Sequence, residues 1–233
     1  MSAEKPQVSP LRVLFVTSPL MLAMVLGVSV AVLIALSWIG GTAEGARAEI
    51  TFESDCPAQW AERVQARAGA IGLGDPSLAQ RGAQVSLTAT LPGLEDDQTA
   101  IPALLTAPGV FAVYAAETVD SAPEGTPLAT NDDIEDVFFQ LDATGHPYTQ
   151  VDLSPVAGQR VEAAAPPALL YVLDGQVVDT FHSELGFKGS KLELHPKLLS
   201  TKEEVRRATD WMLMLKFGPA PCEARGVGIR VVE

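Results

Sequence analysis

Basic residues are scarce in this sequence. The chain has 16 Lys and Arg residues against 29 Asp and Glu residues, and its formal net charge is −13. An acidic surface repels phosphate backbones, which excludes nucleic acid as a partner. It also offers no basic patch for anionic lipid headgroups, so any attachment to a membrane has to come from apolar residues.

Motifs of catalysis and metal binding are also missing. There is no phosphate-cradling glycine loop, no Gly-x-Ser-x-Gly and no His-Glu-x-x-His. The histidines are far apart in the sequence and have no metal-ligand spacing: His146, His182 and His195. We therefore expect a protein that is not an enzyme and that holds no metal and no cofactor.

Charged side chains are absent from one long stretch near the N-terminus, residues 13–39. As a helix, its apolar centre at 20–39 is long enough to span a hydrocarbon layer of roughly 30 Å. Lys5 and Arg12 precede this stretch, which favours a cytoplasmic N-terminus and places the bulk of the chain outside the cytoplasm.

Two interpretations of this stretch remain. It is either an uncleaved transmembrane anchor or a signal peptide that is cleaved after Ala48. Ala46-Arg47-Ala48 has the small-x-small form of a cleavage site. Signal peptides usually have a shorter apolar core, and this difference favours the anchor.

Only two cysteines are present, Cys56 and Cys222, one at each end of the part after the apolar stretch. In an oxidising compartment such a pair is expected to form a disulfide bond. The alternative is two free thiols, since the loop that the bond would close is very long.

The first half of the remaining sequence has alternating strand and helix patterns. Trp60, Val64 and Ala68 have helical spacing and predict a helix over 58–71. Acidic residues at 95–97 favour the start of a second helix, which Pro108-Gly109 ends. Three segments are rich in β-forming residues and predict strands: 49–54, 84–91 and 110–116.

The second half is β-rich until its end. The segment 117–136 is acidic and contains prolines, and it is typical of a solvated connection. Asp174-Gly175 predicts a tight hairpin turn. Ser200 and Glu203 form a capping box that starts a helix, which ends at Gly218-Pro219. Further strands are expected over 137–141, 148–152, 168–173, 176–182 and 223–232.

These patterns predict an α+β protein with a ferredoxin-like base and an inserted β-rich head lobe, preceded by one transmembrane helix. The base is expected to come from two separated stretches, 49–116 and 200–233. The acidic connector and the head lobe are expected at 117–199. The N-terminal parts are expected to be a cytoplasmic tail at 1–12, the anchor at 13–39 and a linker at 40–48.

Four segments resemble, in the same order, the first periplasmic domain of SecD, the auxiliary membrane subunit of the bacterial Sec protein translocase. The first is VSLTATLPGL at 85–94, followed by a helix and by Gly109-Val110-Phe111. The others are FFQLDATGHPY at 138–148, LYVLDGQVV at 170–178 and the helix, turn and strand over 201–227. Together they cover most of the chain, and the fold of that family agrees with the predicted elements.

The resemblance implies a single-pass protein of the bacterial inner membrane whose bulk is periplasmic. Its function would be to assist protein export by binding the exported polypeptide or by docking on Sec translocase components. SecD itself has further membrane helices that take part in proton-driven export together with SecF. Because residues 13–39 contain no ionisable side chain, we expect no proton-coupled channel in this chain. The alternative is an envelope structural or scaffold protein that kept the fold without a role in translocation.

A groove for an apolar client segment is a further hypothesis. Phe138, Phe181 and Phe187 are its candidate lining residues, although their alternation is equally typical of core positions. The two lobes would be joined by 117–136 and by a second connection near His195-Pro196-Lys197. Proline, glycine and solvated charge in these connections are typical of a hinge.

Overall fold

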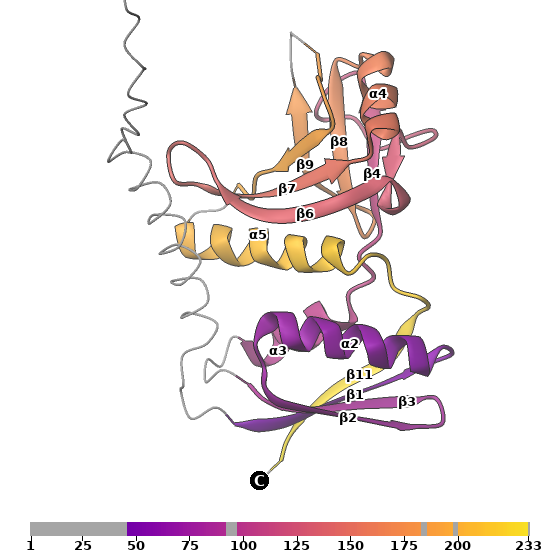
Figure 1. Cartoon of the computed structure of the whole chain (residues 1–233), viewed down its shortest axis with the longest axis vertical. Coiled ribbons are helices and arrows are strands. Elements are labelled where there is room, and N and C mark those ends of the chain that lie inside the picture. Colours follow the sequence, from indigo (N-terminus) through magenta and orange to yellow (C-terminus); the bar gives the residue numbers. More distant parts are fainter. Residues whose placement is uncertain (1–45, 92–96, 183–185, 198–199, 233) are drawn as a thin grey trace, which may run out of the picture. The chain divides into compact units, whose positions relative to one another are not determined.

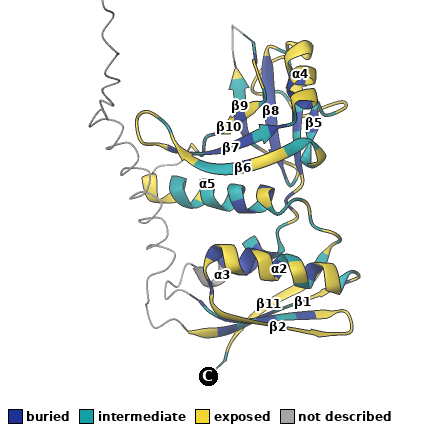
Figure 2. Cartoon of the chain, viewed as in Figure 1, coloured by how far each residue is buried: buried dark blue, intermediate teal, exposed yellow. Residues whose placement is uncertain are grey.

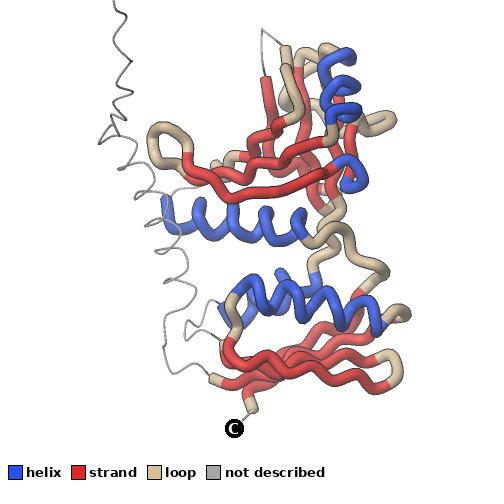
Figure 3. The backbone as a smooth tube through the Cα atoms, in the orientation of Figure 1, coloured by secondary structure: helices blue, strands red, loops and turns tan. Residues whose placement is uncertain are grey.

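The computed structural model describes residues 46–91, 97–182, 186–197 and 200–232. Figures 1 and 3 show helices and antiparallel sheets, which confirms the predicted α+β class. The elements follow the chain in this order: β1 (Arg47–Ser54), α2 (Pro57–Ile71), β2 (Gly74–Arg81), β3 (Gln84–Thr90), α3 (Asp97–Thr106), β4 (Phe111–Ala116), β5 (Ala129–Thr130), η1 (Asn131–Asp133), β6 (Ile134–Leu141), β7 (Pro147–Leu153), α4 (Pro155–Ala164), β8 (Ala168–Leu173), β9 (Gln176–His182), β10 (Lys191–Leu194), α5 (Thr201–Lys216) and β11 (Ala224–Val231).

One four-stranded sheet combines strands from both ends of the described chain. Its order is β11-β1-β3-β2, and neighbouring strands are antiparallel. Every second residue of β1 and β3 is buried, as expected for strands with one face on a core. These side chains pack with those of α2 and α3. The first core therefore includes Ile50, Phe52, Trp60, Val64, Val85, Leu87, Ile101 and Leu105.

Two further sheets enclose a second core. Their orders are β5-β4-β8-β9 and β10-β7-β6. All six residues of β8 are buried, so this strand has no solvated face (Figure 2). The helix α4 covers this core with Ala157 and Val161. Other members are Phe111, Val113, Val137, Val151, Leu169, Tyr171, Leu173, Leu192 and Leu194.

The helix α5 contributes to both cores. Trp211 and Leu215 are buried in the second core, whereas Leu213, between them in sequence, is buried in the first. Figure 1 shows α5 running along β6 and β7. The Thr149 hydroxyl on β7 donates a hydrogen bond to the Ala208 carbonyl at 2.7 Å, which fixes the position of the helix on this sheet. The predicted cap is present, because the Ser200 hydroxyl accepts the Glu203 N–H.

Two boundaries of the predicted base differ from the structure. The strand expected at 110–116 is β4, and it pairs with β8 along its whole length instead of with β1 or β3. Of the stretch 200–233, α5 packs against β6 and β7, and β11 alone enters the first sheet. Periodicity predicts that a segment is a strand or a helix, but it does not predict its partner.

Two elements of the structure, β2 and α4, were not predicted from the sequence. Gly74, Asp75 and Pro76 begin β2, a strand that was not predicted from the sequence. This strand forms a hairpin with β3 through the two-residue turn Gly82-Ala83. The helix α4 was not expected either, although Ser154 caps it and Pro155 occupies its first position. By contrast, Asp174-Gly175 forms the predicted turn between β8 and β9.

The predicted transmembrane anchor at 13–39 lies outside the described residues, as does the tail at 1–12. Within the described ranges, the structure contains no helix that is both long and apolar enough to cross a membrane. The anchor therefore stays a prediction.

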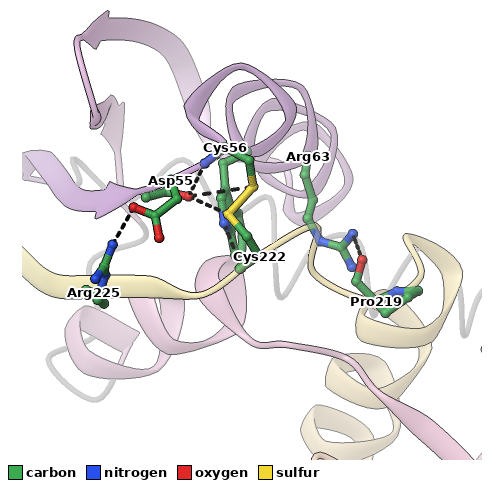
Figure 4. The surroundings of a disulfide bond; sticks show 8 residues. Asp55, Cys56, Arg63, Pro219, Cys222 and Arg225 are labelled. Atoms are coloured by element: carbon green, nitrogen blue, oxygen red, sulfur yellow. Dashed lines mark hydrogen bonds and ion pairs between the residues drawn. A yellow bond between two sulfur atoms is a disulfide. The ribbon is translucent and has the colours of Figure 1, made fainter.

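The predicted disulfide bond between Cys56 and Cys222 is present, with Cα atoms 6.2 Å apart and a sequence separation of 166 residues. Cys56 is the N-cap residue of α2, and Cys222 lies two residues before β11 (Figure 4). The Trp60 indole N–H donates to the Cys222 carbonyl at 3.0 Å. The bond thus attaches the segment before β11 to the start of α2.

We expect the disulfide to stabilise the native state by constraining the unfolded chain. The double substitution C56A/C222A should lower the free energy of unfolding by about 2–5 kcal/mol, as for other native disulfides. Urea unfolding followed by tryptophan fluorescence measures this difference. A reductant should lower the midpoint of the wild-type protein and leave that of C56A/C222A unchanged. Equal midpoints for wild type and variant without reductant would contradict the prediction.

Candidate functional site

The three candidate groove aromatics are not brought together as a set. Phe181 on β9 and Phe187 contact each other edge to face, with ring centroids 6.1 Å apart. Both line a pocket of about 370 Å³. Phe138 lies on β6, where the Lys216 ammonium is 5.9 Å from its ring centroid, and it is not among the residues that line this pocket.

The pocket lies on the second core, between β9 and β10. Phe187 is only 7% exposed and belongs to the core, while Phe181 is partly buried against it. The apolar floor is therefore formed by side chains that also serve in packing. The pocket is lined by Tyr171, Asp179, Thr180, Phe181, Phe187, Lys188, Lys191, Glu193, His195 and Lys197.

One wall of the pocket is held by a buried carboxylate. Asp179 accepts the backbone N–H groups of Thr180 and His195, at 2.8 and 2.7 Å, and pairs with the Lys197 ammonium at 3.0 Å. The His195 ring stacks on Tyr148 of β7, with centroids 5.0 Å apart. We call the part of the chain around the second core the second lobe. The segment 195–197, which was predicted as a hinge between lobes, is thus fixed within this second lobe.

The chain passes between the two cores at other places than predicted. It leaves the first core through 107–110, between α3 and β4, and returns through 217–223, between α5 and β11. The segment 117–136 lies within the second lobe, because β5 pairs with β4 and β6 pairs with β7. The two crossings meet where the Ala220 N–H donates to the Pro108 carbonyl at 2.5 Å. We call these two crossings the junction.

A buried arginine holds the first crossing. Arg67 on α2 has no exposed surface and donates to the carbonyls of Leu104, Leu105 and Ala107, at 2.9, 3.1 and 2.9 Å. These carbonyls belong to the end of α3 and to the residues after it, where the helix leaves carbonyls without intrahelical partners. The Arg67 side chain therefore connects the end of α3 to the C-terminal part of α2.

A second arginine holds the returning crossing. Arg63, one turn before Arg67, donates to the Pro219 carbonyl at 2.5 Å (Figure 4). Burial is the main reason that the pKa of Arg67 is lowered to about 9; the charge of Arg63 lowers it further, and the Asp174 carboxylate acts in the opposite direction. Burial likewise lowers the pKa of Arg63, again opposed by Asp174.

The start of β4 is fixed by side chains from the second lobe. Asp174 accepts the Val110 N–H at 2.7 Å through its side chain and donates its own N–H to the Val110 carbonyl at 2.8 Å. Asn131 donates to the Gly109 carbonyl at 3.0 Å and accepts the Phe111 N–H at 2.8 Å. Besides forming the predicted turn, Asp174 therefore holds the start of β4 through Val110.

These junction residues were not predicted, although one signal was present in the sequence. Arg67 is located on the buried face of α2 that carries Trp60, Val64, Ala68 and Ile71. A charged residue at a core position requires buried hydrogen-bond partners. Helical periodicity alone could thus have identified Arg67 as a buried residue that needs hydrogen-bond partners. Asp174 and Asn131 gave no comparable signal, since their partners are remote in sequence.

Among the described strands, β11 forms an open edge of the first sheet. Its Val227, Ile229 and Val231 are 43%, 39% and 57% exposed. Ile229 and Val231 lie opposite Ile50 and Ala48, which are buried on the helix-covered face of the sheet. Side chains two residues apart share a face, so Ile229 and Val231 form an apolar strip, and Val227 extends it across an irregularity of the β1–β11 register.

The backbone of β11 is also open at this edge. The Val232 N–H donates to the Arg47 carbonyl, so alternate residues of β11 bond to β1. The N–H and C=O groups of Ile229 and Val231 therefore point away from β1. The opposite edge strand, β2, carries Asp75, Pro76 and an irregular register, which are devices that discourage strand pairing.

No family model matches this sequence, and no match is found among curated proteins. Among solved structures, the crystal structure of SecDF in a super-membrane-facing form matches with a TM-score of 0.63 and 20% identity. That match covers 91% of this chain and 35% of the SecDF chain. A second SecDF structure, described as a membrane component that enhances protein export, matches with a TM-score of 0.59 and 20% identity. It is covered over its whole length, by 79% of this chain.

These matches establish the fold. The resemblance to SecD that was predicted from the sequence is thereby confirmed at the level of fold. This chain spans about a third of the length of the first SecDF chain that it matches. In the described ranges, no group of three or more His, Cys, Asp or Glu residues is placed to hold a metal ion. The expectations that the protein is not an enzyme and holds no cofactor stay predictions.

We expect the junction to be sensitive to a small change at Gly109. This residue has φ +68°, and an added Cβ would lie 2.9 Å from the Met214 carbonyl oxygen. G109A should lower the free energy of unfolding by about 2–4 kcal/mol, since it combines a left-handed backbone with a backbone clash. The matched control is G82A, which has φ +62° and no neighbouring atom within 4 Å. Urea unfolding of both variants measures the difference, and equal losses would refute the role of the junction contact.

Proposed function

We propose that this chain is a membrane-anchored, extracytoplasmic SecD-like domain that assists protein export. The match of the described fold to SecDF structures is the observation that carries this proposal. The first sheet, with the order β11-β1-β3-β2, would form the ferredoxin-like base together with α2 and α3. The second lobe would be the inserted head. The chain would act without a proton-coupled channel of its own.

The open edge of β11 favours docking on a translocase component as one way of acting. A partner strand placed beside β11 would find N–H and C=O groups of Ile229 and Val231 that no described strand pairs with. Its side chains would cover the apolar strip of Val227, Ile229 and Val231. Strand addition of this kind combines backbone hydrogen bonds with apolar contacts at alternate residues.

The pocket on the second core favours polypeptide binding as the other way of acting. It offers two aromatic side chains, Phe181 and Phe187, on its floor. Of the predicted groove, these two residues remain candidates, and Phe138 does not share their pocket. Swinging of the head on the base would have to occur at the junction, where Pro108-Gly109 and Gly218-Pro219 lie in the two crossings.

The anchor at 13–39 leads to a prediction about fractionation. Because this stretch carries no charge, we expect the full chain to remain in the membrane pellet after carbonate washing. Immunoblotting of pellet and supernatant measures this. A released species that begins at Glu49 would instead support the cleaved signal peptide.

A photo-reactive side chain at selected surface positions tests the proposed function. A probe at Ile229 should cross-link to Sec translocase components, and a probe at Phe181 should cross-link to an arrested export intermediate. Val156 on α4 is 71% exposed and far in sequence from both surfaces, so it serves as the control position. Adducts with wall or outer-membrane proteins alone would support the alternative of an envelope scaffold.

A charge on the apolar strip should weaken docking. We expect V227K to lower the yield of cross-links from Ile229 by about tenfold, since an unpaired lysine at a dry interface costs on the order of 1–3 kcal/mol. The matched control is V177K, because Val177 on β9 is 42% exposed, close to the 43% of Val227. Equal yields for the two variants would count against docking through β11.

A further inference from the structure

The pocket beside Phe181 gathers positive charge in an otherwise acidic protein. Lys188, Lys191 and Lys197 all line it, and they are three of the six lysines in the chain. The whole chain has a formal charge of −13, so most of its surface repels anions. This pocket is therefore a local exception to the charge of the molecule.

The three lysines differ in whether a carboxylate of the protein already pairs with them. Lys197 is paired with Asp179, and that carboxylate also accepts two backbone N–H groups. Asp179 has 4% of its side chain exposed, so little of it is left for another cation. Lys188 and Lys191 make no ion pair within the described part of the chain. They are the two charges that are available to a ligand.

The remaining charged groups of the pocket do not cancel these two lysines. Glu193 has 56% of its side chain exposed, and its nearest basic partner is the His195 ring at 3.4 Å. The Tyr171 hydroxyl is buried, and burial raises its pKa well above the ordinary value, so it is neutral at physiological pH. Counting Lys188, Lys191 and Lys197 against Asp179 and Glu193 leaves a net positive pocket.

The floor of the same pocket is apolar. Phe181 and Phe187 present an edge-to-face pair, and Tyr171, which is buried in the core, also lines the pocket. A volume of about 370 Å³ is at the small end of ligand pockets, which hold roughly 300–1,000 Å³. It suits one or two side chains of a flexible segment better than the surface of a folded protein.

We propose that this pocket binds a polypeptide segment in which an apolar side chain is followed by a carboxylate. The apolar side chain would lie on Phe181 and Phe187, and the carboxylate would reach Lys188 and Lys191. This inference rests on the proposed function and adds the chemical class of the client. Acidic, partly apolar segments are repelled elsewhere on the protein, so the pocket selects them by charge as well as by apolar contact.

Binding of two matched peptides to the full chain in nanodiscs of zwitterionic lipid tests the inference. Both probes are end-capped, fluorescent octapeptides, one with Leu-Phe-Asp-Asp at its centre and one with Leu-Phe-Asn-Asn. Fluorescence anisotropy at low salt should show the acidic peptide binding about three- to tenfold more tightly, as expected for two partly exposed ion pairs. Added salt should reduce this preference.

Substitution of the two available lysines identifies the site. K188Q/K191Q should bind both peptides with equal affinity, because the two changes remove charge and keep the apolar floor. K216Q is the matched control, since Lys216 lies near Asp136 and Phe138, away from this pocket. It should keep the preference for the acidic peptide. Unchanged thermal unfolding of all three proteins shows that the fold is retained.

Several results would overturn the inference. These are no preference in the wild-type protein, a preference that survives in K188Q/K191Q, and an equal loss in K216Q. Displacement of the acidic peptide by vesicles of phosphatidylglycerol would assign the pocket to an anionic lipid instead. None of these results affects the cross-links from Ile229, which does not line the pocket. Failure of this inference is therefore separable from failure of the proposed function.

Discussion

The pairing of β1 with β11 is the constraint on which the rest of the structure depends. It places Ile229 opposite Ile50, so the four-stranded first sheet is complete only when the two ends of the described chain meet. The elements between α3 and β11 are consequently an insertion in the first sheet. The chain must leave the first core before this insertion and return to it afterwards at the same place. Bringing distant segments together costs loop-closure entropy, which the disulfide between Cys56 and Cys222 reduces by shortening the unfolded loop.

The junction shows how the fold satisfies this constraint. The two crossings bond to each other through Pro108 and Ala220, and each crossing is also held by an arginine of α2. A buried guanidinium is unfavourable unless it is hydrogen-bonded, so Arg67 and the carbonyls at the end of α3 need each other. The carbonyls at the end of α3 and after it thereby accept from Nη1 of Arg67, while its Nε and Nη2 have no partner among the described residues. The same contacts leave little room for a side chain at Gly109.

Much of the secondary structure could be predicted from the sequence, and little of the pairing could. Trp60, Val64 and Ala68 identified α2, and Ser200 identified the start of α5, because periodicity and capping are local signals. The disulfide followed from compartment and number of cysteines. The strand β4 was assigned to the wrong sheet, because FAVYAA fits either core by composition.

The same limit applies to the candidate sites. The aromatic residues of the groove were chosen by residue type, which does not distinguish Phe138 on β6 from Phe181 on β9. The open edge of β11 could not be foreseen, since exposure of an edge depends on what pairs elsewhere in the sheet. The lysines of the pocket are close together in sequence, but their significance appears only with Phe181 and Asp179 beside them.

The two proposed surfaces belong to different cores, and this separation has a physical consequence. The edge of β11 is part of the first core, and the pocket of Lys188 and Lys191 is part of the second. No pocket residue belongs to the first sheet, so neither ligand would occupy the place of the other. Among the described elements, α5 and the junction are common to both cores, so coupling between the two surfaces would pass through them.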